Sequence, residues 1–186
     1  MRDIHPILVR SCSTAACPFG GFRHGGDRKL PHYSFYFLFK MATRSRIGLQ
    51  INDEAILSVY HHWDGYPEWL GVTLREKFNT REKVAELIDG GDISCCDSDT
   101  DWDRNELETS RPLYYNERGD NTEPRLDLNF DEYVGNPAND AEFVYIFTLD
   151  HQWECFAISQ KYNEDFTEVL QTNVVPKEIP QKETVK

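Results

Sequence analysis

The sequence lacks a long apolar run. Its longest uninterrupted apolar stretch, Tyr36-Phe37-Leu38-Phe39, is far shorter than the roughly 20 residues that a membrane-spanning helix needs. Cysteine is also sparse: the chain has five cysteines, no CxxC pair and one adjacent pair. These spacings do not indicate a disulfide framework. The composition is typical of a soluble protein of a reducing cytoplasm.

Positive charge is scarce as well. The chain has 20 Lys and Arg residues against 32 Asp and Glu residues, which gives a formal net charge of −12 at pH 7. Proteins that bind bulk nucleic acid rely on clustered basic side chains, so this composition argues against that class of partner. Any anion that the protein binds needs a local basic pocket in an acidic surface.

Residues 1–40 differ from the rest of the chain. They are basic, contain scattered glycine and proline, and show no sustained hydrophobic period. A transit peptide is one interpretation, and an upstream extension before a true start at Met41 is the favoured one. We predict that residues 1–40 are disordered or spurious, that residues 41–172 form a single domain, and that residues 173–186 form a disordered tail.

Two hairpins and two helices are the clearest predicted elements. Residues 45–62 alternate apolar and polar side chains around a polar turn, and residues 142–160 are dense in aromatic and β-branched residues. Helical spacing predicts helices at 67–78 and 80–89. This order indicates an α+β fold, with a mostly antiparallel sheet of two hairpins covered on one face by the helices.

The segments between these elements carry weaker patterns. The acidic stretch 95–111 has no periodicity and is predicted to be irregular. The shorter elements that we expect are a strand at 114–115, a helical turn at 130–134 and a closing helix at 163–170.

The sequence does not predict a metal or a cofactor. Acidic residues at alternate positions from Asp97 to Asp103 resemble the ligand spacing of an EF-hand loop, but Trp102 occupies the position where that loop needs glycine. His61 and His62 are adjacent on a strand, so they point to opposite faces and cannot chelate one ion together. Glycine-rich phosphate loops, nucleophile elbows and HExxH motifs are absent from the sequence.

The turn at residues 60–68 is the most informative stretch, because it combines histidines, an indole, a carboxylate and phenols. Arginine forks suit phosphates, and aromatic rings can stack on a base. The candidate ligand-binding residues are Arg44, Arg46, His62, Trp63, Asp64, Tyr66, Tyr115 and Arg118. The alternative interpretation is that the aromatic residues belong to the core and that the arginines pair with neighbouring carboxylates.

These residues also carry a resemblance. The segment Thr43-Arg44-Ser45-Arg46-Ile47-Gly48 and the segment Tyr60-x-His62-Trp63-Asp64-Gly65-Tyr66-Pro67-Glu68 resemble motifs of a family of small uncharacterised proteins from tailed phages. Gly91-Asp92-Ile93-Ser94 and the stretch from Tyr115 to Asp120 extend the similarity, which covers about residues 41–160. The resemblance implies a phage accessory protein acting in the cytoplasm of the infected bacterial host.

Three functions fit the sequence. The leading hypothesis is a non-enzymatic accessory protein, with counter-defence as one such role, that binds a nucleotide-like anionic small molecule or a host or defence protein. The second is a phosphate-ester hydrolase or transferase in which Asp64 orients His62 as general base. The third is an acidic inhibitor of a basic protein partner. A homo-oligomer is compatible with each of them.

Overall fold

The computed structural model describes residues 42–136, 140–165 and 167–181, which all belong to one compact unit. The extension at residues 1–40 lies outside the described residues. The first predicted hairpin is confirmed: β1 (Ser45–Gln50) pairs antiparallel with β2 (Ile56–His61). Asn52 closes its turn, because its Oδ1 accepts hydrogen bonds from the backbone N–H groups of Glu54 and Ala55.

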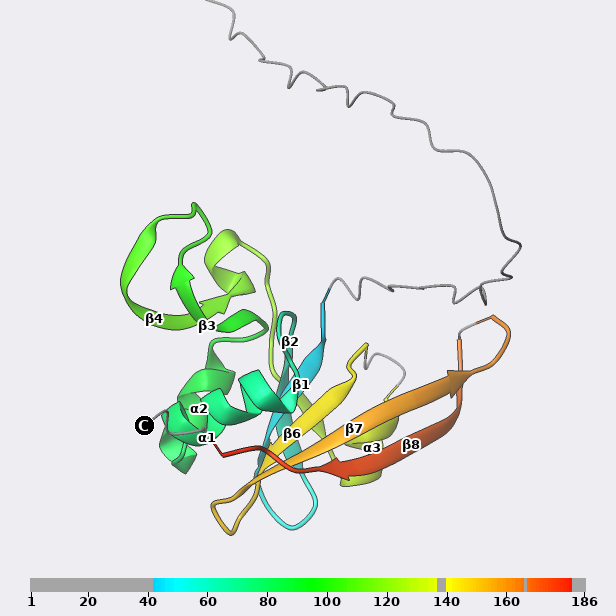
Figure 1. Cartoon of the computed structure of the whole chain (residues 1–186). Coiled ribbons are helices and arrows are strands. Elements are labelled where there is room, and N and C mark those ends of the chain that lie inside the picture. The colour runs from blue at the N-terminus through cyan, green and yellow to red at the C-terminus, as the bar shows by residue number, and fades with distance from the viewer. Residues whose placement is uncertain (1–41, 137–139, 166, 182–186) are drawn as a thin grey trace, which may run out of the picture. The chain divides into compact units, whose positions relative to one another are not determined.

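The second predicted hairpin is also confirmed. Strand β6 (Phe143–Phe147) pairs antiparallel with β7 (Trp153–Tyr162). Because β6 lies parallel beside β1, the two hairpins join into one sheet. The strand order is β4-β3-β2-β1-β6-β7-β8, and β5 (Arg125–Asp127) pairs with β2 off this path. This mixed, mostly antiparallel sheet confirms the predicted α+β class (Figure 1).

Helices cover one face of the sheet as predicted. Pro67 opens the turn η1 (Pro67–Gly71), which continues into α1 (Val72–Lys77), and α2 (Arg81–Asp89) follows. Thr80 caps α2 by accepting a hydrogen bond from the N–H of Lys83. The buried side chains that these helices contribute are Leu70, Leu74, Val84, Leu87 and Ile88, and they pack against Ile47, Leu49 and Phe147 of the sheet.

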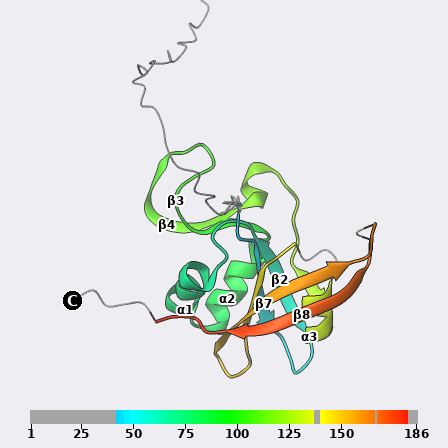
Figure 2. The same cartoon turned by 45° about the vertical axis from the view of Figure 1, so that its right-hand side comes forward.

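The opposite face is covered too. The predicted helical turn is present as α3 (Phe130–Gly135), and its residues Tyr133 and Val134 pack in a second cluster with Val144 and Ile146 of β6. The sheet is therefore enclosed between α1 and α2 on one side and α3 on the other (Figure 2). Alternate side chains of β1 and β2 face α3 rather than solvent, which matters for the arginines below.

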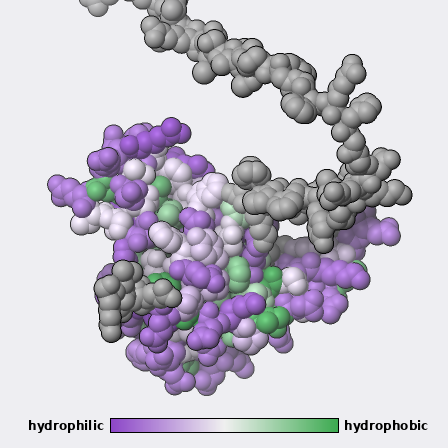
Figure 3. Space-filling model, in the orientation of Figure 1, coloured by the Kyte–Doolittle hydropathy of each residue, from purple (hydrophilic) through white to green (hydrophobic). Residues whose placement is uncertain are grey.

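Three sequence-based expectations are wrong. The stretch expected to be irregular forms an antiparallel pair, β3 (Ile93–Thr100) and β4 (Glu106–Tyr114), followed by the 3₁₀ turn η2 (Tyr115–Arg118). Its strands are polar because the hairpin projects from the sheet, and its surface is mostly hydrophilic (Figure 3).

The closing helix at 163–170 and much of the disordered tail are replaced by β8 (Val169–Lys177), which pairs with β7. Beyond β8, Ile179 is buried in the main core. The described part of the domain thus continues past residue 172, because cross-strand pairing with β7 orders a segment with little local pattern of its own.

Candidate functional site

The motif turn follows directly from the end of β2. The N–H groups of His62 and Trp63 donate to the carbonyl oxygens of Ile93 and Ser94 at 3.0 and 2.9 Å, so this segment is fixed against β3. Asp64 has a φ of 57°, a left-handed conformation that suits a tight turn. Gly65 then comes close to another segment: a Cβ built there would lie 2.6 Å from the carbonyl oxygen of Thr43.

Three rings form a row at this turn. The Tyr60 hydroxyl and His62 Nδ1 are hydrogen bonded at 2.7 Å, and the His62 ring meets Trp63 edge-on with centroids 4.6 Å apart. Burial raises the pKa of Tyr60 to about 12. Burial also lowers the pKa of His62, and the charge of Arg44 lowers it further, so the imidazole is neutral at pH 7. Trp63 is 43% exposed and presents its ring to solvent.

Arg44 lies beside this row. It forms an ion pair with Asp140, and its charge acts on both Tyr60 and His62. Arg44 and Asp140 also line a pocket of about 470 Å³ between the chain entering β1 and the β6–β7 hairpin. A single cation therefore lies between an aromatic row and a concave surface.

A second aromatic group continues from the first. The Arg118 guanidinium carbon lies 4.7 Å from the Trp102 ring centroid and 4.6 Å from that of Tyr115, and Arg118 Nε pairs with Asp120 at 2.5 Å. Asp92 connects the two groups: its carbonyl oxygen accepts from Tyr115 N, and its carboxylate accepts from the backbone N–H of Tyr60. The aromatic strip is defined here by five rings, Trp63, His62, Tyr60, Tyr115 and Trp102.

Arg46 is not part of this strip. It is 7% exposed on the α3 side of β1, and its guanidinium donates to the hydroxyl of Ser58 at 3.1 Å. Burial lowers the pKa of Arg46, and the nearby charge of Arg125 lowers it further. Its position indicates a structural role, because a ligand in solvent cannot reach a guanidinium enclosed by the sheet and α3.

Among the described residues, Asp64 and Tyr66 make no hydrogen bond or ring contact with the side chains of the strip. Tyr66 begins η1, where its carbonyl oxygen accepts hydrogen bonds from Trp69 and Leu70. Asp64 is exposed, and its charge acts on Cys95, whose pKa is raised mainly by burial. The structure thus brings Arg44, His62, Trp63, Tyr115 and Arg118 along one surface and leaves the other three candidates outside it.

Sequence reasoning missed three contributors to this surface. Tyr60 belonged to the motif but was not selected, Asp140 lies far from Arg44 in the sequence, and Trp102 was considered only within an acidic loop. A tryptophan in an otherwise hydrophilic hairpin turn is a usable signal, since a large ring there needs a partner. The Arg44–Asp140 pair had no local signal.

Comparisons of the chain with protein-family models, curated proteins and solved structures gave no match. Within the described ranges, no helix is long and apolar enough to cross a membrane. Over the same residues, no three His, Cys, Asp or Glu side chains are grouped closely enough to hold a metal ion.

Proposed function

We propose that the protein is a non-catalytic binding protein for a small nucleotide-like anion, and that the aromatic strip with Arg44 is its site. The observation that carries the proposal is the position of Arg44, whose charge acts on the hydrogen-bonded rings of Tyr60 and His62 while Trp63 stacks edge-on beside them. A phosphate would pair with the guanidinium, and a base would stack on the exposed indole.

The ion pair of Arg44 is compatible with this role. Its side chain is 39% exposed and that of Asp140 is 75% exposed. Exposed pairs of this kind contribute only about 0 to 1 kcal/mol, so a doubly charged phosphate can replace the carboxylate at little cost. Arg118, which is stacked on two rings of the strip and paired with Asp120, offers a second cation of the same kind.

The contacts of His62 favour binding over catalysis. A hydrolase would need Asp64 to orient the imidazole, as carboxylates do in catalytic triads. The hydrogen-bond partner of His62 Nδ1 is instead the Tyr60 hydroxyl, and Asp64 makes no hydrogen bond to His62 within the part of the chain that the structure describes.

A second candidate function rests on the β3–β4 hairpin. This hairpin projects from the sheet, its surface is hydrophilic, and it carries Asp97, Asp99, Asp101 and Asp103 (Figures 1 and 3). Such a surface suits a basic host or defence protein, with electrostatics that accelerate association. The phage accessory and counter-defence roles remain proposals that rest on the sequence resemblance.

Titration calorimetry with adenosine and guanosine 5′-monophosphates tests the proposed site. Arg44→Met should weaken binding by about tenfold or more, because a charge-assisted pair contributes about 1.5 to 3 kcal/mol. Trp63→Ala should remove about 1 to 3 kcal/mol of base stacking. Arg81→Met is the matched control, since Arg81 donates to Ile51 at the other end of β1.

Three results would contradict the proposal. The first is saturable binding of the uncharged nucleosides with the same affinity as the nucleotides. The second is an equal loss of nucleotide affinity in Arg44→Met and Arg81→Met. The third is an absence of binding at millimolar nucleotide. Asp64→Asn separates binder from enzyme: the binding protein tolerates the change, whereas an enzyme that uses His62 as base would lose its phosphate-ester hydrolysis.

A further inference from the structure

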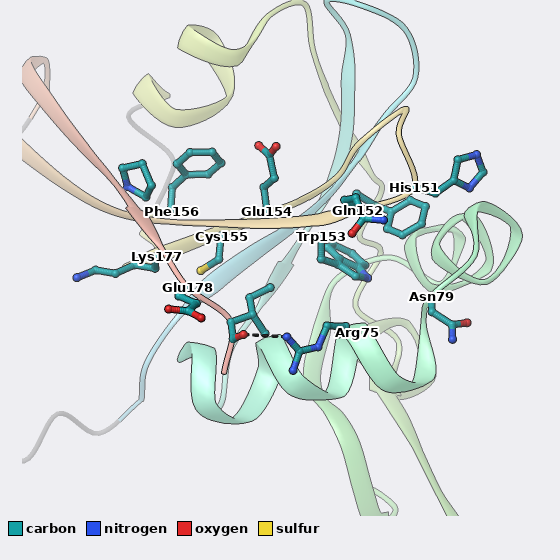
Figure 4. Close-up of a pocket in the computed structure, with 13 residues that line it drawn as sticks. Arg75, Asn79, His151, Gln152, Trp153, Glu154, Cys155, Phe156, Lys177 and Glu178 are labelled. Carbon is teal, nitrogen blue, oxygen red and sulfur yellow. Dashed lines mark hydrogen bonds between the residues drawn. The ribbon is translucent and has the colours of Figure 1, made fainter. Parts of the chain in front are cut away.

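A cavity of about 720 Å³ lies between β7, α1 and the segment that follows β8. It shares no residue with the aromatic strip. In Figure 4 the side chains of Trp153 and Cys155 point from β7 toward α1, whereas Glu154 and Phe156 point to the other side of the strand. Its volume falls within the roughly 300 to 1,000 Å³ typical of small-molecule sites.

The wall from β7 is apolar and fixed. The Trp153 indole N–H donates to the Phe78 carbonyl oxygen at 2.8 Å, which orients the ring and uses its only donor. Cys155 is 3% exposed, and burial raises the pKa of its thiol to about 12, so it is a neutral, weakly polar surface. Phe147 and Ile179, both buried, complete the apolar lining.

The facing wall carries one fixed cation. Arg75 Nη1 donates to the Ile179 carbonyl oxygen at 2.8 Å, and Nη2 donates to that of Pro180. These bonds hold the guanidinium between α1 and the chain after β8, beneath Trp153 (Figure 4). A guanidinium has five N–H donors, so these two bonds leave capacity for a carboxylate. Asn79, just beyond the end of α1, adds an amide to the lining.

The lining carries two basic side chains, Arg75 and Lys177, and the fixed Arg75 guanidinium can pair with an anion. Glu154 points to the other side of β7, whereas Glu178 directly precedes Ile179, whose carbonyl oxygen accepts from Arg75 (Figure 4). We propose that the cavity binds a compact aromatic carboxylate, with its ring against Trp153 and Cys155 and its carboxylate on Arg75. The binding is non-covalent, because a protonated thiol is a poor nucleophile.

The test uses the full chain, with naphthalene-2-carboxylate as the probe and 2-naphthylmethylamine as the probe of opposite charge. The four tryptophans give separate indole N–H signals in a ¹⁵N NMR spectrum, and Trp153→Phe assigns the signal of interest. We expect the carboxylate to shift the Trp153 signal saturably and the amine to bind at least tenfold more weakly. Arg75→Met should weaken carboxylate binding about tenfold, since it removes a charge-assisted contact.

The matched control is Arg111→Met, because Arg111 lies on β4 at the opposite edge of the sheet and should leave the affinity within twofold. The proposal is overturned if the two probes bind equally, if only the exposed Trp63 or Trp69 responds, or if no signal saturates. Should Arg75→Met fail to fold, the comparison of the two probes on the unmodified chain still decides the question.

Discussion

Stability should depend on pH through His61, which is buried at the end of β2 and 1% exposed. Its Nε2 accepts a hydrogen bond from the backbone N–H of Cys96 at 3.2 Å, so Nδ1 carries the proton and lies 3.0 Å from the Ser45 hydroxyl. Protonation at Nε2 would point two donors at each other inside the core. Burial, with a smaller effect from His62, lowers the pKa of His61 to about 3.

The sign of the effect follows from this lowered pKa. The unfolded chain takes up the proton near pH 6.5 and the folded chain only near pH 3, so the unfolded state is favoured as pH falls between these values. The contribution of His61 is complete above about pH 6.5. Each pH unit below it removes up to about 1.4 kcal/mol, which gives an upper bound of about 4 to 5 kcal/mol over the whole range.

Urea unfolding of the wild-type chain and of His61→Gln at a series of pH values from 7.5 to 4.5 tests this reasoning. Glutamine can accept from Cys96 but does not titrate, so carboxylate effects are common to both proteins. At pH 7.5 the variant should be less stable by about 1 to 3 kcal/mol, because packing and a buried hydrogen bond are perturbed. That difference should shrink steadily below pH 6.5. Parallel curves across the whole range would refute the argument.

Two further predictions concern groups that the sequence suggested were outside the core or on the surface. Ile179→Ala should lower the free energy of unfolding by about 2 to 3 kcal/mol, because Ile179 packs against Gly71 and Tyr145. Val175→Ala, at an exposed position of β8, should lower it by less than about 0.5 kcal/mol. Equal effects of the two substitutions in urea unfolding would contradict the packing of the C-terminal segment. Arg46→Ala should lower the free energy of unfolding by about 2 to 4 kcal/mol, because it leaves an internal cavity. Arg46→Met should lower it clearly less, since methionine fills the volume without a buried charge. A loss below about 0.5 kcal/mol for the alanine variant would place Arg46 on the surface.

The parts of the fold that could be predicted from the sequence are those with a local period. Residues 45–62 alternate as a strand hairpin, and the spacing of Leu70 and Leu74 indicates a helix on the same apolar face. Strand β8 could not be found in this way, because its pairing partner rather than its own pattern orders it. The β3–β4 hairpin was missed because its strands carry few apolar residues and their pairing is interrupted by register shifts, so neither strand shows a regular apolar alternation.

The candidate site also combines contacts that adjacent residues make with contacts that distant segments make. The turn at Asp64 and Gly65 and the neighbouring rings of His62 and Trp63 follow from adjacent residues, so the sequence located them. The ion pair between Arg44 and Asp140 and the position of Trp102 over Tyr115 depend on segments that are distant in the sequence. No local pattern encodes such contacts.

The burial of Arg46 shows how a distant helix changes the meaning of a local pattern. In the sequence of β1, Arg46 alternates with the apolar Ile47, and this alternation predicts that Arg46 faces solvent. In the structure, α3 covers that face of the sheet. The Tyr133 hydroxyl of α3 donates to the carbonyl oxygens of Arg46 and Tyr145, and Arg125 Nη2 donates to the Tyr133 carbonyl. Buried polar networks of this kind hold their members in one arrangement.

This arrangement bears on the proposed site, because Arg46 is the cross-strand neighbour of Tyr60. The side chains of such neighbours start from the same face of the sheet, where the Arg46 guanidinium turns to Ser58 and the Tyr60 hydroxyl bonds His62. The Tyr60 ring of the strip thus projects from a paired strand of the sheet rather than from a loop. If the proposed site binds a ligand, a strip anchored on this packed sheet would need little reorganisation, and the role of Arg46 would be structural.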